Sequence, residues 1–277
     1  MKKWITLLII LGVISGCEAN EKTLHEFTKE HDQMEKLSPV LLEALSKSTN
    51  KTVQDIKVED FLNIEELSLD TNSVPLEQKD VQIDLSVISK MKNLKSLTLY
   101  KINVKDYLFL KDLNELEYLS IIGFREDQLP TLFNSKLSSL SLDEGDLSDL
   151  KILQNSKSIT HLSIRNNRIK DLSFIELPNV VFLDVSNNPI TSIDFIKEIP
   201  NLGRLQIMNA PVTDIAAVQY TPKLEYLDIR GTKVTSIHPL IKLEELSILL
   251  VDRKSISDLH LLKKEVKVAE NGYEIND

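Results

Sequence analysis

The chain has 277 residues, of which 42% are hydrophobic and 27% charged, so it carries enough apolar side chains to fold. Its 33 basic and 42 acidic residues give a formal net charge of −9, which disfavours binding to nucleic-acid phosphates and adsorption to anionic lipid. A single cysteine excludes an internal disulfide framework and a thiolate metal cluster. We expect no nucleic-acid partner, no metal and no cofactor.

The first seventeen residues have the features of a bacterial secretion signal. Lys2 and Lys3 precede a short apolar run over residues 4–13, which is too short to span a membrane. The following Ile-Ser-Gly-Cys resembles the lipobox of bacterial lipoproteins. That resemblance implies that residues 1–16 are a lipoprotein signal peptide and that Cys17 receives fatty-acyl chains such as palmitate. The alternative is an ordinary secreted protein with a chance cysteine.

Residues 17–63 precede the repeats and show two patterns. The charged segment 17–36 is interpreted as the anchor and a spacer from the membrane, with an additional cap helix as the alternative. In residues 37–63, a break at Ser38-Pro39 is followed by apolar residues at helical spacing. Because a stack of repeats needs its first apolar layer covered, we predict that residues 37–63 form an N-terminal helical cap.

One pattern recurs along residues 64–265, mostly with a period of about 22 residues. Each unit reads L-x-x-L-x-L, which is typical of a strand with one buried face, and apolar residues at three-residue steps after it indicate a short helical turn. Such a period predicts a solenoid in which every unit buries its apolar face against its neighbours. The last two starts are closer together than the others, which predicts a trimmed eighth unit. The nine units begin at Ile64, Leu94, Leu116, Leu137, Ile159, Val180, Leu202, Leu224 and Leu243.

The C-terminus, residues 266–277, closes differently. Val266 and Val268 begin an alternating pattern around Asn271-Gly272. This dipeptide is a strong signal for a hairpin with a type I′ turn. We predict a C-terminal hairpin that caps the last apolar layer of the stack.

The repeated unit, seen best over residues 162–175, resembles the leucine-rich repeat, and its length and turn resemble the internalin-like class of bacterial surface proteins. The resemblance implies an α/β solenoid: a right-handed coil with a parallel concave sheet and short helical or 3-10 turns on the convex side. It also implies a ladder of asparagines whose amides satisfy backbone groups. Only Asn72, Asn167 and Asn188 supply it in this chain.

The outward-facing positions of stacked strands should line one concave surface. They are rich in aromatic, arginine and methionine side chains, which are enriched at protein-binding hot spots. In the alternative, Arg204 pairs with Asp184 on the adjacent strand, and Arg230 pairs with Asp228 in the same way. The candidate protein-binding residues are Tyr118, His161, Arg165, Phe182, Asp184, Arg204, Met208, Tyr226, Asp228 and Arg230.

Catalysis has little support in the sequence. His161, Ser163 and Asp184 fall on neighbouring strands, but an open strand floor offers no oxyanion hole and no water-excluding pocket. We therefore expect a monomeric, non-catalytic lipoprotein of the bacterial cell envelope, attached to the cell membrane or outer membrane, that binds another protein through its concave face. The alternatives are an envelope scaffold and, from the internalin likeness, a host-surface adhesin.

Overall fold

The computed structural model describes residues 37–71, 82–131, 136–153, 156–173 and 176–270. The predicted signal peptide, the anchor segment 17–36 with Cys17, the ladder residue Asn72 and the hairpin turn at Asn271-Gly272 lie outside these residues. Within the described ranges, no helix is both long and apolar enough to cross a membrane.

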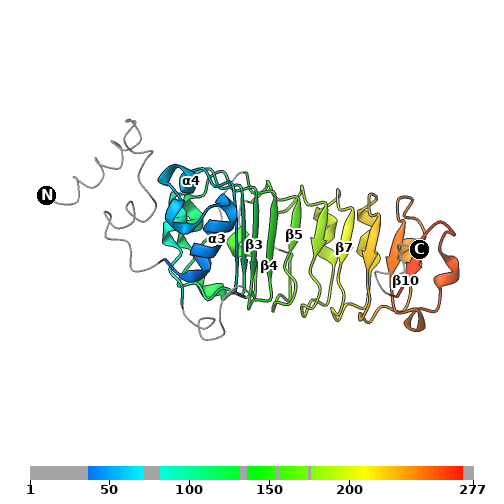
Figure 1. Ribbon diagram of the computed structural model, residues 1–277. Helices are drawn as coiled ribbons and strands as arrows, with labels where there is room; N and C mark the ends of the chain where they lie inside the picture. Colours follow the sequence, from blue (N-terminus) through cyan, green and yellow to red (C-terminus); the bar gives the residue numbers. More distant parts are fainter. Residues whose placement is uncertain (1–36, 72–81, 132–135, 154–155, 174–175, 271–277) are drawn as a thin grey trace.

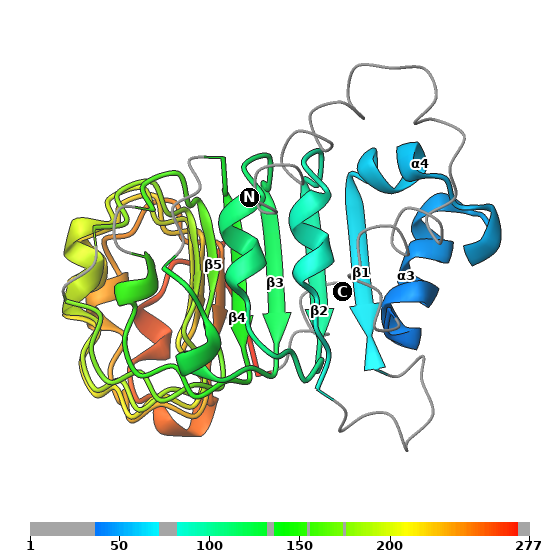
Figure 2. The ribbon, with the colours of Figure 1, turned by 90° about the vertical axis from the view of Figure 1, so that its left-hand side faces the viewer.

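Helices occupy the segment that precedes the repeats: α3 (Pro39–Thr49), the 3-10 turn η2 (Val53–Asp55) and α4 (Val58–Leu62). Helix α3 begins where the sequence predicts, because the Ser38 hydroxyl accepts a hydrogen bond from the Leu41 amide at 3.2 Å and Pro39 fixes the first turn. Leu41 and Phe61 are fully buried. Figure 2 shows α3 and α4 beside β1 (Glu66–Asp70), at one end of the stack.

All strands of the described residues form one parallel sheet in chain order. In Figure 2 the first strands are seen broadside and the later turns nearly end-on, so the stack bends along its length. This architecture confirms the predicted solenoid with a concave parallel sheet. After β1, the strands are β2 (Ser96–Tyr100), β3 (Tyr118–Ile122), β4 (Ser139–Asp143), β5 (His161–Ser163), β6 (Phe182–Asp184), β7 (Arg204–Gln206), β8 (Tyr226–Asp228), β9 (Ile248–Leu250) and β10 (Lys267–Ala269).

Short 3-10 helices return the chain between strands, as the three-residue apolar steps predict. Each is too short to bury much surface by itself, and most of them pack apolar residues into the shared core; η7 and η12 contain no apolar residue, and η13 has none that is fully buried. They are η5 (Ser86–Lys90), η6 (Leu108–Asp112), η7 (Glu126–Gln128), η8 (Lys151–Leu153), η9 (Asp194–Glu198), η10 (Ala216–Tyr220), η11 (His238–Leu240), η12 (Arg253–Ser255) and η13 (Leu259–Leu261).

The middle leucines of successive units pair in register and form one buried row. Leu119, Leu162, Leu183 and Leu227 are each at most 2% exposed and belong to a single continuous core. Each rung therefore packs on the rungs before and after it, and no unit has a core of its own.

The asparagine ladder is present where the sequence provides it. The Asn188 side chain is buried; its Nδ2 donates to the carbonyls of Ile164 (2.8 Å) and Val185 (3.0 Å), and its Oδ1 accepts from the Ile169 amide (3.0 Å). Asn167 bridges its own unit and the preceding one in the same way. Each amide thus satisfies backbone groups of two units at once.

The predicted register of the ninth unit is wrong. In β9, Leu249 pairs with Leu227, so the unit starts at Leu246 rather than Leu243 and follows Leu224 by one full period. Leu243 is buried one turn earlier, at the position that Ile199 has in its own unit. The eighth unit is therefore full length. The shortened step falls between β9 and β10, where Val268 pairs with Leu249.

Strand β10 joins the sheet by pairing parallel with β9. The C-terminal segment thus supplies a tenth strand before the predicted hairpin turn. The remainder of that hairpin, residues 271–277, lies outside the described residues.

Candidate binding surface

Four of the predicted residues stand side by side on four adjacent strands: His161, Phe182, Arg204 and Tyr226. They are paired by register as His161 with Phe182, Phe182 with Arg204, and Arg204 with Tyr226. We call these four residues the aromatic–arginine row. Adjacent parallel strands are about 4.8 Å apart, so side chains at paired positions must touch along the row.

The side chains of the row stack continuously. The His161 and Phe182 rings lie 6.1 Å apart between centroids, with an interplanar angle of 21°. The Arg204 guanidinium carbon lies 5.8 Å from the Phe182 centroid and 4.4 Å from the Tyr226 centroid. Both distances are within the range of cation–π attraction. Two aromatic rings therefore hold the cation between them.

Arg204 does not form the predicted pair with Asp184. Its side chain is exposed, and among the described residues it makes no ion pair. Stacking on Phe182 and Tyr226 takes the place of the carboxylate partner. Of the two predicted arginine–aspartate pairs, this one is wrong.

Arg230 does pair with Asp228, but within one repeat unit: Asp228 is the last residue of β8, and Arg230 lies two positions beyond it. Its Nη2 lies 2.6 Å from Asp228 Oδ2 and its Nε 2.9 Å from Oδ1. This bidentate contact raises the pKa of Arg230, and Asp228 is almost completely buried. Asp228 thereby occupies the Nε and Nη2 donors of Arg230.

Arg165 is also occupied. Its backbone amide donates to Asp143 Oδ1 at 2.8 Å, and its Nη2 donates to Asp143 Oδ2 at 3.2 Å. Its Nε lies 3.7 Å from Asp184 Oδ2. Two buried carboxylates therefore sit beneath one exposed guanidinium. Asp143 was not among the predicted residues; its position one step past the last leucine of its unit was the only signal for it.

Burial raises the pKa of Asp184, and this effect outweighs the hydrogen bond from Ser186 and the positive charge of Arg165. The Ser186 amide donates to Asp184 Oδ1 at 3.0 Å. Burial, with the charge of Asp228, likewise raises the pKa of the Tyr226 phenol. Near the row, the carboxylates of Asp143, Asp184 and Asp228 are therefore buried beneath the aromatic and arginine side chains.

Tyr118 and Met208 complete the set of predicted residues but lie apart from the row. Tyr118 is exposed on β3, and Ser139 on β4 separates it from His161. Met208 is half-buried beyond the end of β7, where its amide donates to the Ser186 hydroxyl at 3.2 Å. The corrected register also adds Ile248 to the face next to Tyr226.

The residues weighed for a hydrolase triad are not assembled as one. The Ser163 hydroxyl donates to Asp143 at 2.8 Å, and the His161 ring lies 2.9 Å from the Thr160 hydroxyl. Within the described parts of the chain, no three His, Cys, Asp or Glu side chains gather in a way that would hold a metal ion.

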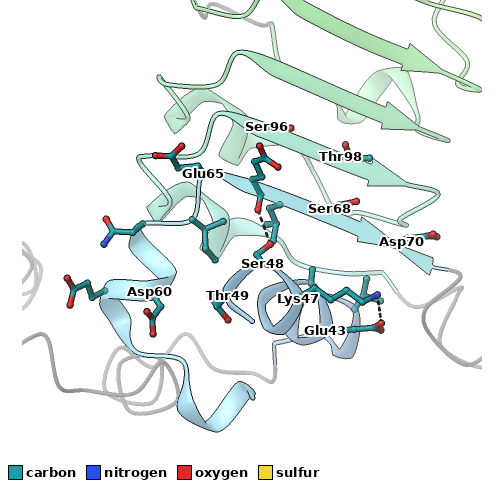
Figure 3. Close-up of a pocket in the computed structure, with 17 residues that line it drawn as sticks. Glu43, Lys47, Ser48, Thr49, Asp60, Glu65, Ser68, Asp70, Ser96 and Thr98 are labelled. Carbon is teal, nitrogen blue, oxygen red and sulfur yellow. Dashed lines mark hydrogen bonds and ion pairs between the residues drawn. The ribbon is translucent and has the colours of Figure 1, made fainter. Parts of the chain in front are cut away.

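The structure also contains a groove that sequence reasoning missed, between the cap helices and strands β1 and β2 (Figure 3). It has a volume of about 1060 Å³ and a polar lining rich in carboxylates. Three of these carboxylates already have lysine partners: Glu43 with Lys47, Asp60 with Lys51, and Glu65 with Lys95. Internal pairing therefore satisfies much of the acidic lining. No sequence pattern signals the groove, because its two walls come from different kinds of element.

Comparison with known proteins agrees with this geometry. Residues 157–198 match the family model for leucine-rich repeats in two copies. The fold is a leucine-rich repeat solenoid. Internalin C2 of Listeria monocytogenes is similar in structure, with a TM-score of 0.62 and 21% identity over 77% of this chain and 93% of that one. InlP of the same organism gives a TM-score of 0.60 and 17% identity over 79% and 68%. A third solved structure, the internalin InlF, gives 0.52 and 18% over 84% and 95%.

At these identities, the likeness extends to the fold. The residues of the concave face therefore have to be interpreted from their own contacts.

Proposed function

We propose that this protein is a non-catalytic, lipid-anchored component of the bacterial cell envelope that binds another protein through its concave face. The observation that carries the proposal is the aromatic–arginine row, four stacked side chains on four adjacent strands. Large planar groups held in place lose little conformational freedom on binding, and Tyr and Arg are enriched among the residues that dominate interface energies. A concave face that contacted only water would not require stacked aromatic and arginine side chains.

The anchor part of the proposal rests on the sequence. The lipobox-like Ile-Ser-Gly-Cys ends at Cys17, the chain's single cysteine. Acyl chains are needed for attachment because the acidic body gains nothing from anionic lipid. In the native host, a Cys17→Ser variant should lose metabolic labelling by an alkynyl fatty acid and leave the membrane fraction. Persistent labelling or membrane retention of the variant would contradict the anchor.

The binding part is tested by site-specific photo-crosslinking in native membranes. A benzophenone amino acid replaces Tyr226 on the concave face or Tyr220 on η10, where the tyrosine is exposed on the opposite side of the unit. We expect a discrete protein adduct from position 226 and none from 220. Adducts from 220 alone would place the interface elsewhere.

A matched pair of double variants adds an energetic test. The chain has a cation–π pair on each side of the solenoid: Arg204 on Tyr226 at 4.4 Å and Lys197 on Tyr220 at 5.6 Å. Arg204→Glu with Tyr226→Ala should abolish the adduct formed by a probe at His161, whereas Lys197→Glu with Tyr220→Ala should leave it unchanged. If both double variants reduced the yield of the adduct by a small and equal amount, the envelope-scaffold alternative would be favoured. An adduct with a host-cell protein would favour the adhesin alternative.

A further inference from the structure

The concave face carries three arginines, and only one of them lacks a carboxylate partner within the described residues. Arg165 contacts Asp143 and Asp184, and Arg230 contacts Asp228. Arg204 contacts aromatic rings instead. A guanidinium has five N–H donors in its plane, and stacking occupies the faces of that plane but not its edge. The Tyr226 hydroxyl accepts a hydrogen bond from Arg204, and the remaining donors of the Arg204 edge are available for a planar, bidentate acceptor.

The surroundings of Arg204 define what that acceptor can be. Phe182 and Tyr226, on either side, are half-buried rings, so an incoming group meets one cation between two apolar walls. The chain as a whole has a net charge of −9, and the neighbouring arginines Arg165 and Arg230 are already paired with carboxylates. This arrangement suits a single carboxylate next to an apolar group and disfavours a polyanion such as nucleic acid.

We propose that Arg204, clamped between Phe182 and Tyr226, receives an Asp or Glu side chain of the partner protein, with an apolar side chain of the same segment against the rings. This inference rests on the proposed function and names the chemistry of the partner. The ring contacts orient the guanidinium before binding, which lowers the entropy lost when the ion pair forms. The ion pair then sets which segment binds, because a neutral segment leaves the arginine desolvated and unpaired.

The test uses the full-length protein and a bead-bound library of random N-acetylated peptides. Attachment through the peptide C-terminus removes every carboxylate except those of side chains. Peptides that bind the wild-type protein should be enriched in Asp or Glu next to an apolar residue. The Arg204→Glu variant should select Lys or Arg at that position instead. The convex-face variant Lys197→Glu, which alters the other cation–π pair, should select the same peptides as the wild type.

Affinity measurements with one selected peptide sharpen the test. Changing its acidic residue to the amide should weaken binding to the wild type at least about tenfold and should not weaken binding to Arg204→Glu. Arg204 is exposed and its contacts with the rings contribute little to stability, so its substitution should lower the unfolding temperature only slightly.

Three outcomes would overturn the inference. Peptides that lose affinity on Tyr226→Ala yet show no acidic enrichment would exclude the carboxylate while leaving the concave face as the binding site. Peptides insensitive to Tyr226→Ala and Phe182→Ala would count against both the inference and the proposed function. Binding of the acidic peptides to Arg204→Glu as tightly as to the wild-type protein would also overturn it.

Discussion

Lys101 forms an ion pair with Glu144 across an intervening unit of the solenoid, at a distance of 3.0 Å. The unit between them contributes Gly123 at the equivalent position, and an ideal Cβ there would lie 3.4 Å from the Lys101 side chain. All three residues have positive φ, with values of 54° for Lys101, 77° for Gly123 and 56° for Glu144. The turn after each of these strands thus requires the left-handed conformation, which is costly for Lys and Glu.

The first prediction concerns this turn. Later units place Asn166, Asn187 and Asn209 at the same position, also with positive φ. Glu144→Asn should raise the free energy of unfolding by about 0.5–1 kcal/mol, because asparagine tolerates the conformation and an exposed ion pair contributes little. Urea denaturation measures the change. Glu115→Asn, which removes another exposed ion pair from a residue without positive φ, is the control and should give no gain.

The second prediction concerns two ladder positions that lack asparagine. Phe124 fills the space beside Gly145, where an ideal Cβ would lie 2.6 Å from Cε1 of the ring. Gly145→Ala should therefore destabilise the protein by about 1–3 kcal/mol through overpacking. Gly203→Ala is the control, because its Cβ would meet backbone atoms only at 3.6 Å or beyond. A smaller side chain in Phe124→Leu should make the Gly145→Ala change milder, and additive effects in the double-mutant cycle would contradict the steric explanation.

The third prediction concerns the asparagine ladder. Asn188→Ala should lower the free energy of unfolding by about 3 kcal/mol, since it leaves several buried backbone groups of two units without partners. Thermal and urea unfolding measure the loss. Asn179→Ala, which removes one exposed hydrogen bond to the Lys157 carbonyl, should cost less than about 1 kcal/mol. Equal losses from the two variants would show that the ladder contributes no special stability.

The fourth prediction follows from the buried carboxylate of Asp184. Its pKa is raised in the folded protein, so the folded state binds the proton more tightly than the unfolded state does. The ionised Asp184 carboxylate destabilises the folded protein in full above its raised pKa. This destabilisation decreases as the pH falls below that pKa and is gone below the pKa of the carboxyl in the unfolded chain. Asp184→Asn should therefore be at least as stable as the wild type at pH 7, and its advantage should vanish as the pH falls toward 4. Unfolding temperatures of both proteins across this range provide the measurement.

The control for that titration has the opposite sign. Hydrogen bonds from Lys197 and Ser192 lower the pKa of Asp194, so its contribution to stability is present at neutral pH and is lost on acidification. Asp194→Asn should therefore be less stable than the wild type at pH 7, and the unfolding temperatures of the two proteins should converge at low pH. An Asp184→Asn variant that behaved like Asp194→Asn would contradict the effect assigned to burial.

The sequence alone determined the solenoid, the buried face of each strand and the columns of the concave face. Strand side chains alternate between the two faces of the sheet, and equivalent leucines recur at a nearly constant interval, so His161, Phe182, Arg204 and Tyr226 had to fall on one face. It also located the amides of Asn167 and Asn188, because a ladder residue at a fixed offset has only backbone groups within reach.

The tertiary structure decided the features that the repeat leaves open. Residues 243–251 are apolar at so many positions that two registers satisfy the pattern, and only pairing with Leu227 selects the one that starts at Leu246. The sequence also left the contact partner of Arg204 undecided, for a similar reason. Aromatic faces and a carboxylate both lie within reach of a long side chain, and the burial of Asp184 beneath Arg165 leaves the rings as its partners. Periodicity specifies where a side chain starts; the packing of its neighbours decides what it touches.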